Sequence, residues 1–382
     1  MTSQTRAGSA PVIVEALRSP IGTAGRSLAA VSAAELAAPV LAAVARRLPG
    51  EQLREVVLGN CMGPGGDLAR VAALHAGLPN TLPALTVDRQ CASGLAAVAL
   101  ATSLVSAEPG VVLAGGVESV STAPWRSWPP ASGAEPVRYE RAPFAPADVG
   151  DPDMGPAADD LARAFGISRA EQDEYAARSH ARAIATVQAR GFDAELVPVG
   201  DIARDDRPRA GLTVQRLARL RPAFGADGTA TAGNSCGVND GAAVVAVAHA
   251  ATHRRLGMPG LRVLATATAG IDPNRPGLSL APAARRALEC ANLTLDDMDV
   301  IEFNEAFAGQ VLACCRDLRL DPERVCPQGG ALALGHPWGA SGAVLVVRLF
   351  SQLVRERAGR YGLAAIAAGG GQGVAMVVET LA

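Results

Sequence analysis

Cys91 has the residue type and the setting best suited to chemistry in this sequence. It precedes Ala-Ser-Gly and an apolar stretch whose spacing is helical. A thiol at the start of a helix meets unpaired backbone N–H groups and the positive end of the helix dipole, and both favour the thiolate. The small residues that follow leave room for a ligand. The pattern predicts a reactive cysteine, with a buried structural cysteine as the alternative interpretation.

Two further polar side chains stand in settings that suit catalysis. His336 is surrounded by glycines, and an imidazole on such a loop can take a proton from a thiol or donate to an oxyanion. Asn304 directly follows a predicted strand at 300–303, and α/β proteins place their chemistry at the carboxyl ends of strands. The alternatives are a histidine that caps its own helix and an asparagine that forms a turn.

Two other segments have the composition of ligand-binding loops. Residues 368–373, Ala-Gly-Gly-Gly-Gln-Gly, would let backbone N–H groups approach a ligand closely, although a tight turn has the same composition. Six arginines lie close together in the chain beside Asp205 and Asp206, and such a group can bind phosphates or form a solvated face. They are Arg204, Arg207, Arg209, Arg216, Arg219 and Arg221.

Composition excludes several classes of protein. All 35 basic residues are arginine, so lysine Schiff-base chemistry and a Walker phosphate loop are excluded. The five histidines do not pair with cysteines at zinc-site spacing, and we expect no metal. A net charge of −2 gives no reason to expect nucleic-acid or membrane binding, and we expect no apolar run of membrane-span length. Irregularly spaced cysteines and no signal pattern in residues 1–20 favour the cytoplasm.

The elements that must position these residues follow an α/β pattern. A length of 382 residues, of which 49% are apolar, predicts two or three domains with large cores. Short β-type runs alternate with Ala-rich helical stretches, and this alternation predicts layers with mostly parallel sheets. The predicted strands cover 12–16, 55–59, 111–114, 300–303 and 363–367, and the predicted helices cover 33–47, 94–106 and 282–291.

The middle of the chain has a different composition. Residues 121–149 are rich in Pro, Ser and Trp, and Ser168-Arg-Ala-Glu171 is a capping box that begins a helix reaching about Gly191. We expect an inserted loop domain at 119–238. Each flanking region contains an Ala-Ser-Gly helix start followed by a strand that ends in glycines, and this faint repeat indicates a duplicated fold.

A set of motifs, taken together, resembles the thiolase family. The motifs occur in the family's order and cover nearly the whole chain. The most specific are Arg89-Gln-Cys-Ala-Ser-Gly-Leu95, Asn304-Glu-Ala-Phe-Ala308 and Gly329-Gly-Ala-Leu-Ala-Leu-Gly-His-Pro-Trp-Gly-Ala-Ser-Gly342. Further segments of the same kind are Arg18-Ser-Pro-Ile-Gly22, Gly115-Gly-Val-Glu-Ser119, Leu220-Arg-Pro-Ala-Phe224, Thr231-Ala-Gly-Asn234 and Asn239-Asp-Gly241.

The resemblance implies a fold and a substrate class. The thiolase fold has two βαβαβαββ halves in a five-layer α-β-α-β-α core. Residues 1–118 with 239–259 would form the first half, 260–382 the second, and 119–238 a loop domain that cradles coenzyme A. The substrate would be an acyl-CoA or an acyl-carrier thioester, with no tightly bound cofactor. A homodimer or homotetramer is expected, and a separate partner subunit is left open.

The resemblance also implies residue roles. Cys91 would form the acyl-enzyme, and His336 would activate its thiol. Asn304 would hold a water that completes, with that histidine, a hole for a thioester oxygen. The backbone N–H groups of Cys91 and Gly369 would form a second hole, and one such donor can be worth ~10²–10³ in rate. The residues expected to contact coenzyme A are Arg207, Arg221, Cys236 and Met154.

The chain departs from the family at a second catalytic cysteine. Where relatives carry Cys-x-Gly-Gly-Gly, this sequence has Ala367-Ala-Gly-Gly-Gly371, and a methyl group cannot transfer a proton. General acid–base help is worth ~10²–10⁴, so ordinary thiolysis or Claisen condensation should be impaired. Three hypotheses follow: acyl transfer to an acceptor that needs no α-deprotonation, a standard thiolase in which Cys326 or Cys61 replaces the base, or a non-catalytic subunit that binds coenzyme A.

Overall fold

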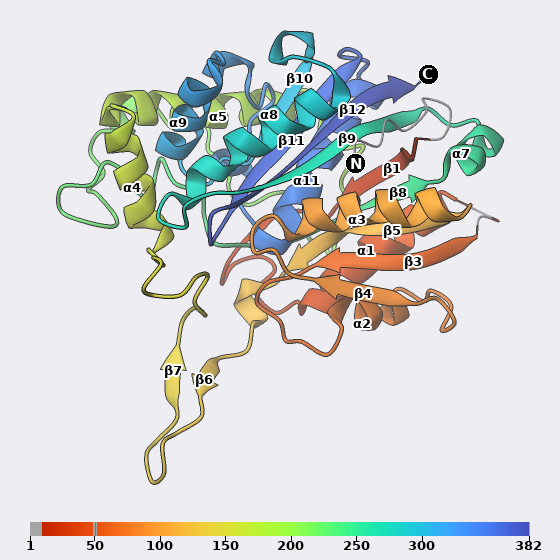
Figure 1. Cartoon of the computed structure of the whole chain (residues 1–382), viewed down its shortest axis with the longest axis horizontal. Coiled ribbons are helices and arrows are strands. Elements are labelled where there is room, and N and C mark those ends of the chain that lie inside the picture. Colours follow the sequence, from red (N-terminus) through yellow and green to blue (C-terminus); the bar gives the residue numbers. More distant parts are fainter. Residues whose placement is uncertain (1–9, 49, 51, 382) are drawn as a thin grey trace.

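The computed structural model describes residues 10–48, 50 and 52–381. Residues 1–9 of the segment searched for a signal pattern therefore lie outside the described residues. Within the described part, two similar halves lie side by side, and a two-stranded hairpin reaches away from them (Figure 1).

The first half has the predicted order of elements, β-α-β-α-β-α-β-β. Its first helix begins at a capping box, because the Ser32 hydroxyl accepts a hydrogen bond from the Glu35 N–H and the Glu35 carboxylate accepts one from the Ser32 N–H. The elements are β1 (Val12–Arg18), α1 (Ala33–Arg46), β3 (Leu53–Gly59), α2 (Leu68–His75), β4 (Ala84–Val87), α3 (Ser93–Ala107), β5 (Val111–Glu118) and β8 (Asn239–Ala248), with the short β2 (Gly22–Thr23) beside β8.

The second half repeats this pattern with one strand missing. In the first half β3, β5, β8 and β1 are neighbours in that order, and in the second half β10, β11, β12 and β9 are neighbours with the same parallel and antiparallel senses. Its elements are β9 (Gly260–Gly270), α8 (Leu280–Ala291), β10 (Val300–Phe303), α9 (Ala308–Leu318), α10 (Ala331–Leu334), α11 (Trp338–Phe350), β11 (Tyr361–Ala368) and β12 (Gln372–Leu381). The helix α7 (Ala250–Leu256) connects the halves.

The counterpart of β4 is reduced to a single bridge between Val325 and Ile301. The backbone of the next residue, Cys326, is left-handed with φ of 48°, and Pro327 has no N–H to donate to a ladder. The second half therefore lacks the third strand that the duplicated fold predicts, although the thiolase fold is otherwise confirmed.

Three large apolar clusters lie between the layers of helices and strands. The strands of each half alternate inward and outward, so that in β8 Val245 and Val247 join the central cluster while Val244 and Ala246 join the cluster under α1. A third cluster lies between the second-half strands and the helices α8 and α9. The helices α3 and α11 lie in the central layer and contact each other and strands of both halves.

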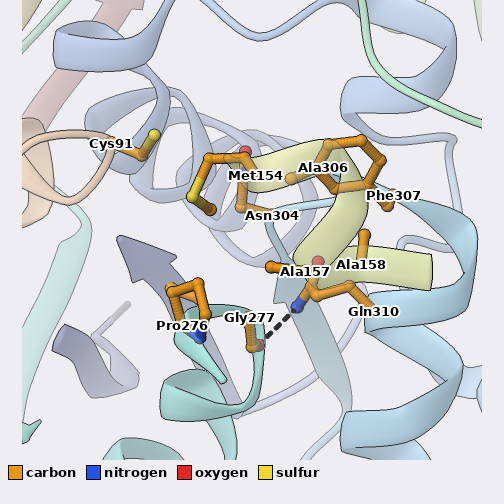
Figure 2. Close-up of a pocket in the computed structure, with 11 residues that line it drawn as sticks. Cys91, Met154, Ala157, Ala158, Pro276, Gly277, Asn304, Ala306, Phe307 and Gln310 are labelled. Atoms are coloured by element: carbon orange, nitrogen blue, oxygen red, sulfur yellow. Dashed lines mark hydrogen bonds between the residues drawn. The ribbon is translucent and has the colours of Figure 1, made fainter. Parts of the chain in front are cut away.

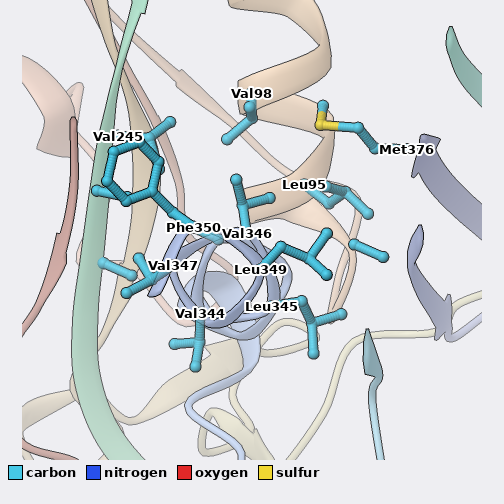
Figure 3. Packing of buried hydrophobic residues seen from close by; sticks show 14 of the residues in the cluster. Leu95, Val98, Val245, Val344, Leu345, Val346, Val347, Leu349, Phe350 and Met376 are labelled. Carbon is cyan, nitrogen blue, oxygen red and sulfur yellow. The ribbon is translucent and has the colours of Figure 1, made fainter. Parts of the chain in front are cut away.

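The central helices approach closely because glycines of one helix lie against the backbone of the other. Figure 3 shows apolar side chains of both helices packed around this contact. A Cβ added to Gly94 would lie 2.7 Å from the Gly339 carbonyl oxygen, and one added to Gly342 would lie 2.4 Å from the Leu95 nitrogen. Both glycines come from the repeated Ala-Ser-Gly motifs, at the start of α3 and of α11. The faint repeat in the sequence is therefore one of the places where the two halves touch, and the pairing of β1 with β9 is another.

Two expectations about the sheet and the apolar runs are wrong. The strands form mixed rather than mostly parallel pairings, because β11 and β12 turn back through Gly369, Gly370 and Gly371 and the corresponding strands β5 and β8 are also antiparallel. The segment Gln90–Ala107 has a mean hydropathy of 1.5 over 18 residues, which is enough by length and composition to cross a membrane. It contains α3, whose central position between two strand layers favours apolar residues around the helix.

The segment between β5 and β8 adds helices and a hairpin to the body of the molecule. As predicted, Ser168 and Glu171 form a capping box, here at the start of α5. The buried Arg18 of β1 ties the segment down, because its guanidinium pairs with Glu195 at 2.7 Å and with Asp205 at 2.7 Å. The elements are β6 (Arg126–Trp128), β7 (Val137–Tyr139), α4 (Met154–Ala164), α5 (Arg169–Gln188) and α6 (Val214–Leu217).

Candidate active site

Cys91 lies on a tight bend two residues before α3 begins. The preceding residue, Gln90, has a left-handed backbone with φ of 48°, which is uncommon for a side chain with a Cβ. The Ser93 hydroxyl holds the bend, because it donates to the Gln90 carbonyl at 2.6 Å and accepts from the Arg89 N–H at 2.7 Å. The strained bend leaves the Cys91 side chain partly exposed at the end of the central helix.

His336 lies at the corresponding bend before α11 and is buried. Its Nδ1 is 2.6 Å from the Ser341 hydroxyl, its Nε2 is 3.4 Å from the Asn304 amide nitrogen, and its backbone N–H donates to Asn239 at 2.9 Å. These contacts fix the plane of the ring. Burial lowers the pKa of His336 to about 3, so the imidazole is neutral at physiological pH.

Glu118 ties the loop after β3 to the start of α11. This buried carboxylate accepts hydrogen bonds from the Gly339 N–H at 3.0 Å, from the Cys61 N–H at 3.1 Å and from the Asn60 side chain at 2.9 Å. It thereby joins the end of β5, the loop after β3 and the start of α11. The sequence analysis did not assign Glu118 a role, although it stands within the motif Gly115-Gly-Val-Glu-Ser119 that supported the family resemblance.

Cys91 and Asn304 face one pocket whose walls are mostly apolar (Figure 2). Ala367 of β11 is also on its wall, so the position of the missing cysteine faces the same space as Cys91. Gln310 lines the pocket too and donates to the Gly277 carbonyl at 3.1 Å. The other lining residues are Met154, Ala157, Ala158, Pro276, Gly277, Ala306 and Phe307.

The charge state of Cys91 differs from the expected thiolate. Burial raises its pKa to about 12, and the neighbouring Cys236 and Glu118 raise it further, against a smaller lowering by its own backbone N–H. Cys91 precedes α3 by two residues, and the effect of a helix dipole falls off away from the terminal turn. Cys91 is therefore a neutral thiol at rest and needs a base to become nucleophilic.

The residues of the last glycine loop lie against the inserted segment. A Cβ at Gly369 would be 2.5 Å from the Phe144 ring, so only glycine fits this approach. Cys326, one of the thiols considered as a replacement base, is buried and donates to the Phe303 carbonyl at 3.2 Å. It does not belong to the wall of the Cys91 pocket. The other, Cys61, is 3.7 Å from the Ser93 hydroxyl.

The four residues expected to contact coenzyme A do not form one group. Met154 lines the pocket and Cys236 interacts electrostatically with Cys91. Arg207 donates instead to the Leu332 carbonyl at 3.2 Å, and burial lowers its pKa. Arg221 is exposed, and neither arginine lines the pocket.

The acidic residues of the arginine-rich segment form ion pairs and hydrogen bonds with the first half of the chain. Asp205 pairs with Arg18, and Asp206 accepts hydrogen bonds from Thr23 and Ser27 at 2.9 and 2.8 Å. These acids therefore do not neutralise the neighbouring exposed arginines. Among residues 10–48, 50 and 52–381, no three His, Cys, Asp or Glu side chains are grouped as a metal site would require.

Comparisons with known proteins cover nearly the whole chain. A family model described as "Thiolase, N-terminal domain" matches residues 11–251, and one described as "Thiolase, C-terminal domain" matches residues 258–380. An acetyl-CoA acetyltransferase of Pseudomonas aeruginosa is 41% identical over 390 residues, which cover 96% of this chain and 98% of that protein. A beta-ketoadipyl-CoA thiolase of Acinetobacter baylyi is 41% identical over 401 residues, with 96% and 98% covered. The crystal structure of human mitochondrial 3-ketoacyl-CoA thiolase in complex with CoA has a TM-score of 0.91 at 34% identity, with 98% and 99% covered.

Proposed function

This chain belongs to the thiolase family and is an acyltransferase, and we propose that it forms an acyl-enzyme on Cys91 from an acyl-CoA. The observation that carries the proposal is the shared pocket of Cys91 and Asn304, with the His336 ring 3.4 Å from that asparagine. The CoA thioesters in the names of the relatives indicate the substrate class.

In the first half-reaction the neutral imidazole of His336 takes the Cys91 proton. The sulfur attacks the thioester carbonyl, a new C–S bond forms, and the bond to the CoA sulfur breaks. Both groups are neutral at rest, and a raised thiol pKa with a lowered imidazole pKa opposes formation of a resting ion pair, so the proton moves only together with the attack of the sulfur. The charge that develops on oxygen would be stabilised by Asn304 and His336, and by the backbone N–H groups of Cys91 and Gly369.

The remaining hypotheses differ in what accepts the acyl group. Ala367 faces the pocket and supplies no proton acceptor there. One hypothesis is transfer to an acceptor that needs no α-deprotonation. The second is a standard acetyl-CoA acetyltransferase or 3-ketoacyl-CoA thiolase with a substitute base, which the names of the relatives favour. A non-catalytic CoA-binding subunit is the third.

Intact-mass measurement after incubation with acyl-CoAs of different chain length tests the proposal. We expect an increase of one acyl group on the native protein and on Cys290→Ala, which removes an exposed cysteine. Cys91→Ala should show no adduct, because the nucleophile is gone. The absence of an adduct with every thioester would defeat the enzyme hypothesis and leave the binding subunit.

Several finer expectations stand as proposals beside this one. We propose that residues 119–238 cradle coenzyme A and that Met154, Cys236, Arg207 and Arg221 are among the residues that contact it. A homodimer or homotetramer and the division into two halves are proposed from the family resemblance, and a cytoplasmic location is proposed from the cysteine spacing. Sedimentation velocity of the purified chain measures the oligomeric state directly.

A further inference from the structure

The pocket wall contains a cysteine position that has lost its thiol, and another thiol, Cys236, lies in a loop whose backbone is bonded to that wall. Cys236 belongs to the loop before β8. Its N–H donates to the Ala306 carbonyl at 2.9 Å, and the preceding Ser235 forms a bridge with Phe307. Ala306 and Phe307 both line the Cys91 pocket. The backbone around Cys236 is thus tied to the pocket wall.

The same loop also reaches the catalytic histidine. Val238, two residues after Cys236, forms a parallel bridge with His336. Cys236 therefore lies between a residue paired with the pocket wall and a residue paired with the histidine. Its side chain is partly exposed, as is that of Cys91.

The pKa of each of these two thiols depends on charged neighbours. After burial, Cys236 makes the largest contribution to the raised pKa of Cys91. Burial raises the pKa of Cys236 to about 12, but the Arg207 guanidinium opposes this and favours the thiolate. Arg207 lies close by, since a Cβ at Gly237 would be 2.3 Å from its Nη1. A buried cation beside a thiol favours its ionised form.

Two polar atoms near this loop point to a ligand. The Gln310 Oε1 on the pocket wall and the Ser235 hydroxyl beside Cys236 have no hydrogen-bond partner among the described residues. Both side chains are at least nine-tenths buried, at 2% and 4% exposure. Buried polar atoms of this kind are normally satisfied, so a polar substrate group bound in the pocket would supply the missing partner of Gln310.

The other thiols are less suitable. Cys326 donates to a carbonyl and lies among the carboxylates Glu302 and Glu305, which raise its pKa. Burial raises the pKa of Cys61, and Glu118, the next largest cause, raises it further. Cys236 is the one of these three thiols that has an arginine among the causes of its shift.

We propose that Cys236 transfers the proton at the α-carbon of the acceptor thioester, the step that Ala367 cannot perform. The inference rests on the proposed acyl-enzyme at Cys91. It places the reaction in the class of Claisen condensation and its reverse, thiolysis, with a second acyl-CoA as the acceptor.

The proton balance closes without another reactant. During acylation His336 keeps the proton of Cys91, and Cys236 gives its own proton to the departing CoA sulfur. The Cys236 thiolate then removes an α-proton from the second acyl-CoA, whose carbanion attacks the acyl carbon on Cys91. A C–C bond forms, the C–S bond breaks, and the Cys91 sulfur takes back its proton from His336. The products are a 3-ketoacyl-CoA and free CoA.

The experiment measures two properties of Cys236→Ala and Cys236→Ser with the acyl-CoA that labels Cys91 best. Intact mass reports the extent of the Cys91 adduct, and deuterium incorporation in D₂O reports exchange of the α-protons. We expect both variants to acylate Cys91 more slowly, because the departing CoA sulfur lacks its proton donor, but still to reach the adduct, while exchange falls by ~10²–10⁴. The serine variant conserves size, and its adduct shows that the site is folded.

Two cysteine variants serve as controls. Cys290→Ala should keep both the adduct and the exchange, and Cys61→Ala tests the competing thiol. Undiminished exchange in the Cys236 variants, or loss of exchange in Cys61→Ala alone, would overturn the inference. A native protein that forms the adduct but exchanges no α-protons would overturn this inference alone. A native protein without any adduct would contradict the proposed function itself.

Discussion

At the scale of single residues, Cys91 is a neutral thiol rather than the expected thiolate, and His336 is a neutral imidazole. Burial raises the pKa of Cys91 and lowers that of His336, so neither group carries charge at rest. The base acts in its neutral form, and an ordinary histidine with a pKa of about 6.5 would lose that form as the pH falls. A pKa lowered to about 3 keeps His336 neutral far below this value.

We therefore expect no titration of His336 between about pH 8 and pH 5. Its ring nitrogens, followed by NMR and assigned with a His336→Asn variant, should keep the shifts of a neutral imidazole. The rate of Cys91 acylation should not fall with protonation of this ring over the same interval. A midpoint near 6.5 for the His336 signals would contradict the burial seen here. The lowered pKa also costs folding stability as the pH falls below about 6.5, because the unfolded chain then binds the proton more readily.

At the scale of elements, the starts of α3 and α11 are kept in contact by Gly94 and Gly342. Cys91 precedes one helix and His336 the other, so the spacing of the helices sets the spacing of the two groups. A methyl group at either glycine would lie within 2.7 Å of backbone atoms of the facing helix. Backbone atoms cannot rotate away as a flexible side chain can.

We expect Gly94→Ala and Gly342→Ala each to lower the free energy of unfolding by ~1–3 kcal/mol and to slow Cys91 acylation. Denaturant titration and intact-mass time courses measure the two effects. Gly225→Ala is the matched control, because an added Cβ there meets nothing within 4 Å. Equal stability of all three variants would show that the helices can separate without cost.

At the scale of the whole molecule, one buried carboxylate joins three parts of the chain. Glu195 of the inserted segment pairs with Arg18 of β1 and with Arg348 of α11, and it accepts a hydrogen bond from Ser351 at 2.6 Å. Burial alone would raise its pKa, but the two guanidinium groups outweigh it, so the pKa is lowered. The stabilisation is therefore present above the pKa of an unfolded glutamate, about 4.3, and is lost as the pH falls below it.

We expect Glu195→Gln to lower the free energy of unfolding at pH 7 by ~3–5 kcal/mol, because it leaves buried guanidinium charge without its partner. The variant should also lose stability less steeply below about pH 4.3 than the native protein. Glu323→Gln changes an ion pair whose carboxylate is 58% exposed, and it should cost at most ~1 kcal/mol. Denaturant titration measures the free energy of unfolding of both variants, and similar losses in the two would contradict this account.

The sequence by itself determined which side chains could do the chemistry. Cys91, His336 and Asn304 stand in continuous motifs, and the missing thiol at Ala367 is visible without any structure. Helix starts such as the capping box of Ser168 are also local, because their hydrogen bonds join residues three apart. These properties depend on neighbours along the chain, so they can be predicted from it.

Only the tertiary structure decided the charge states of these residues and which other residues surround them. The neutral Cys91 and His336 result from burial, and the contact of Glu118 with Gly339 joins residues far apart in the chain. Nothing in the sequence near Cys236 marks it as a neighbour of Cys91. Its position depends on backbone contacts between its loop and two segments of the other half, one at Ala306 and one at His336. Desolvation and long-range proximity arise when the layers pack, and a linear pattern contains neither.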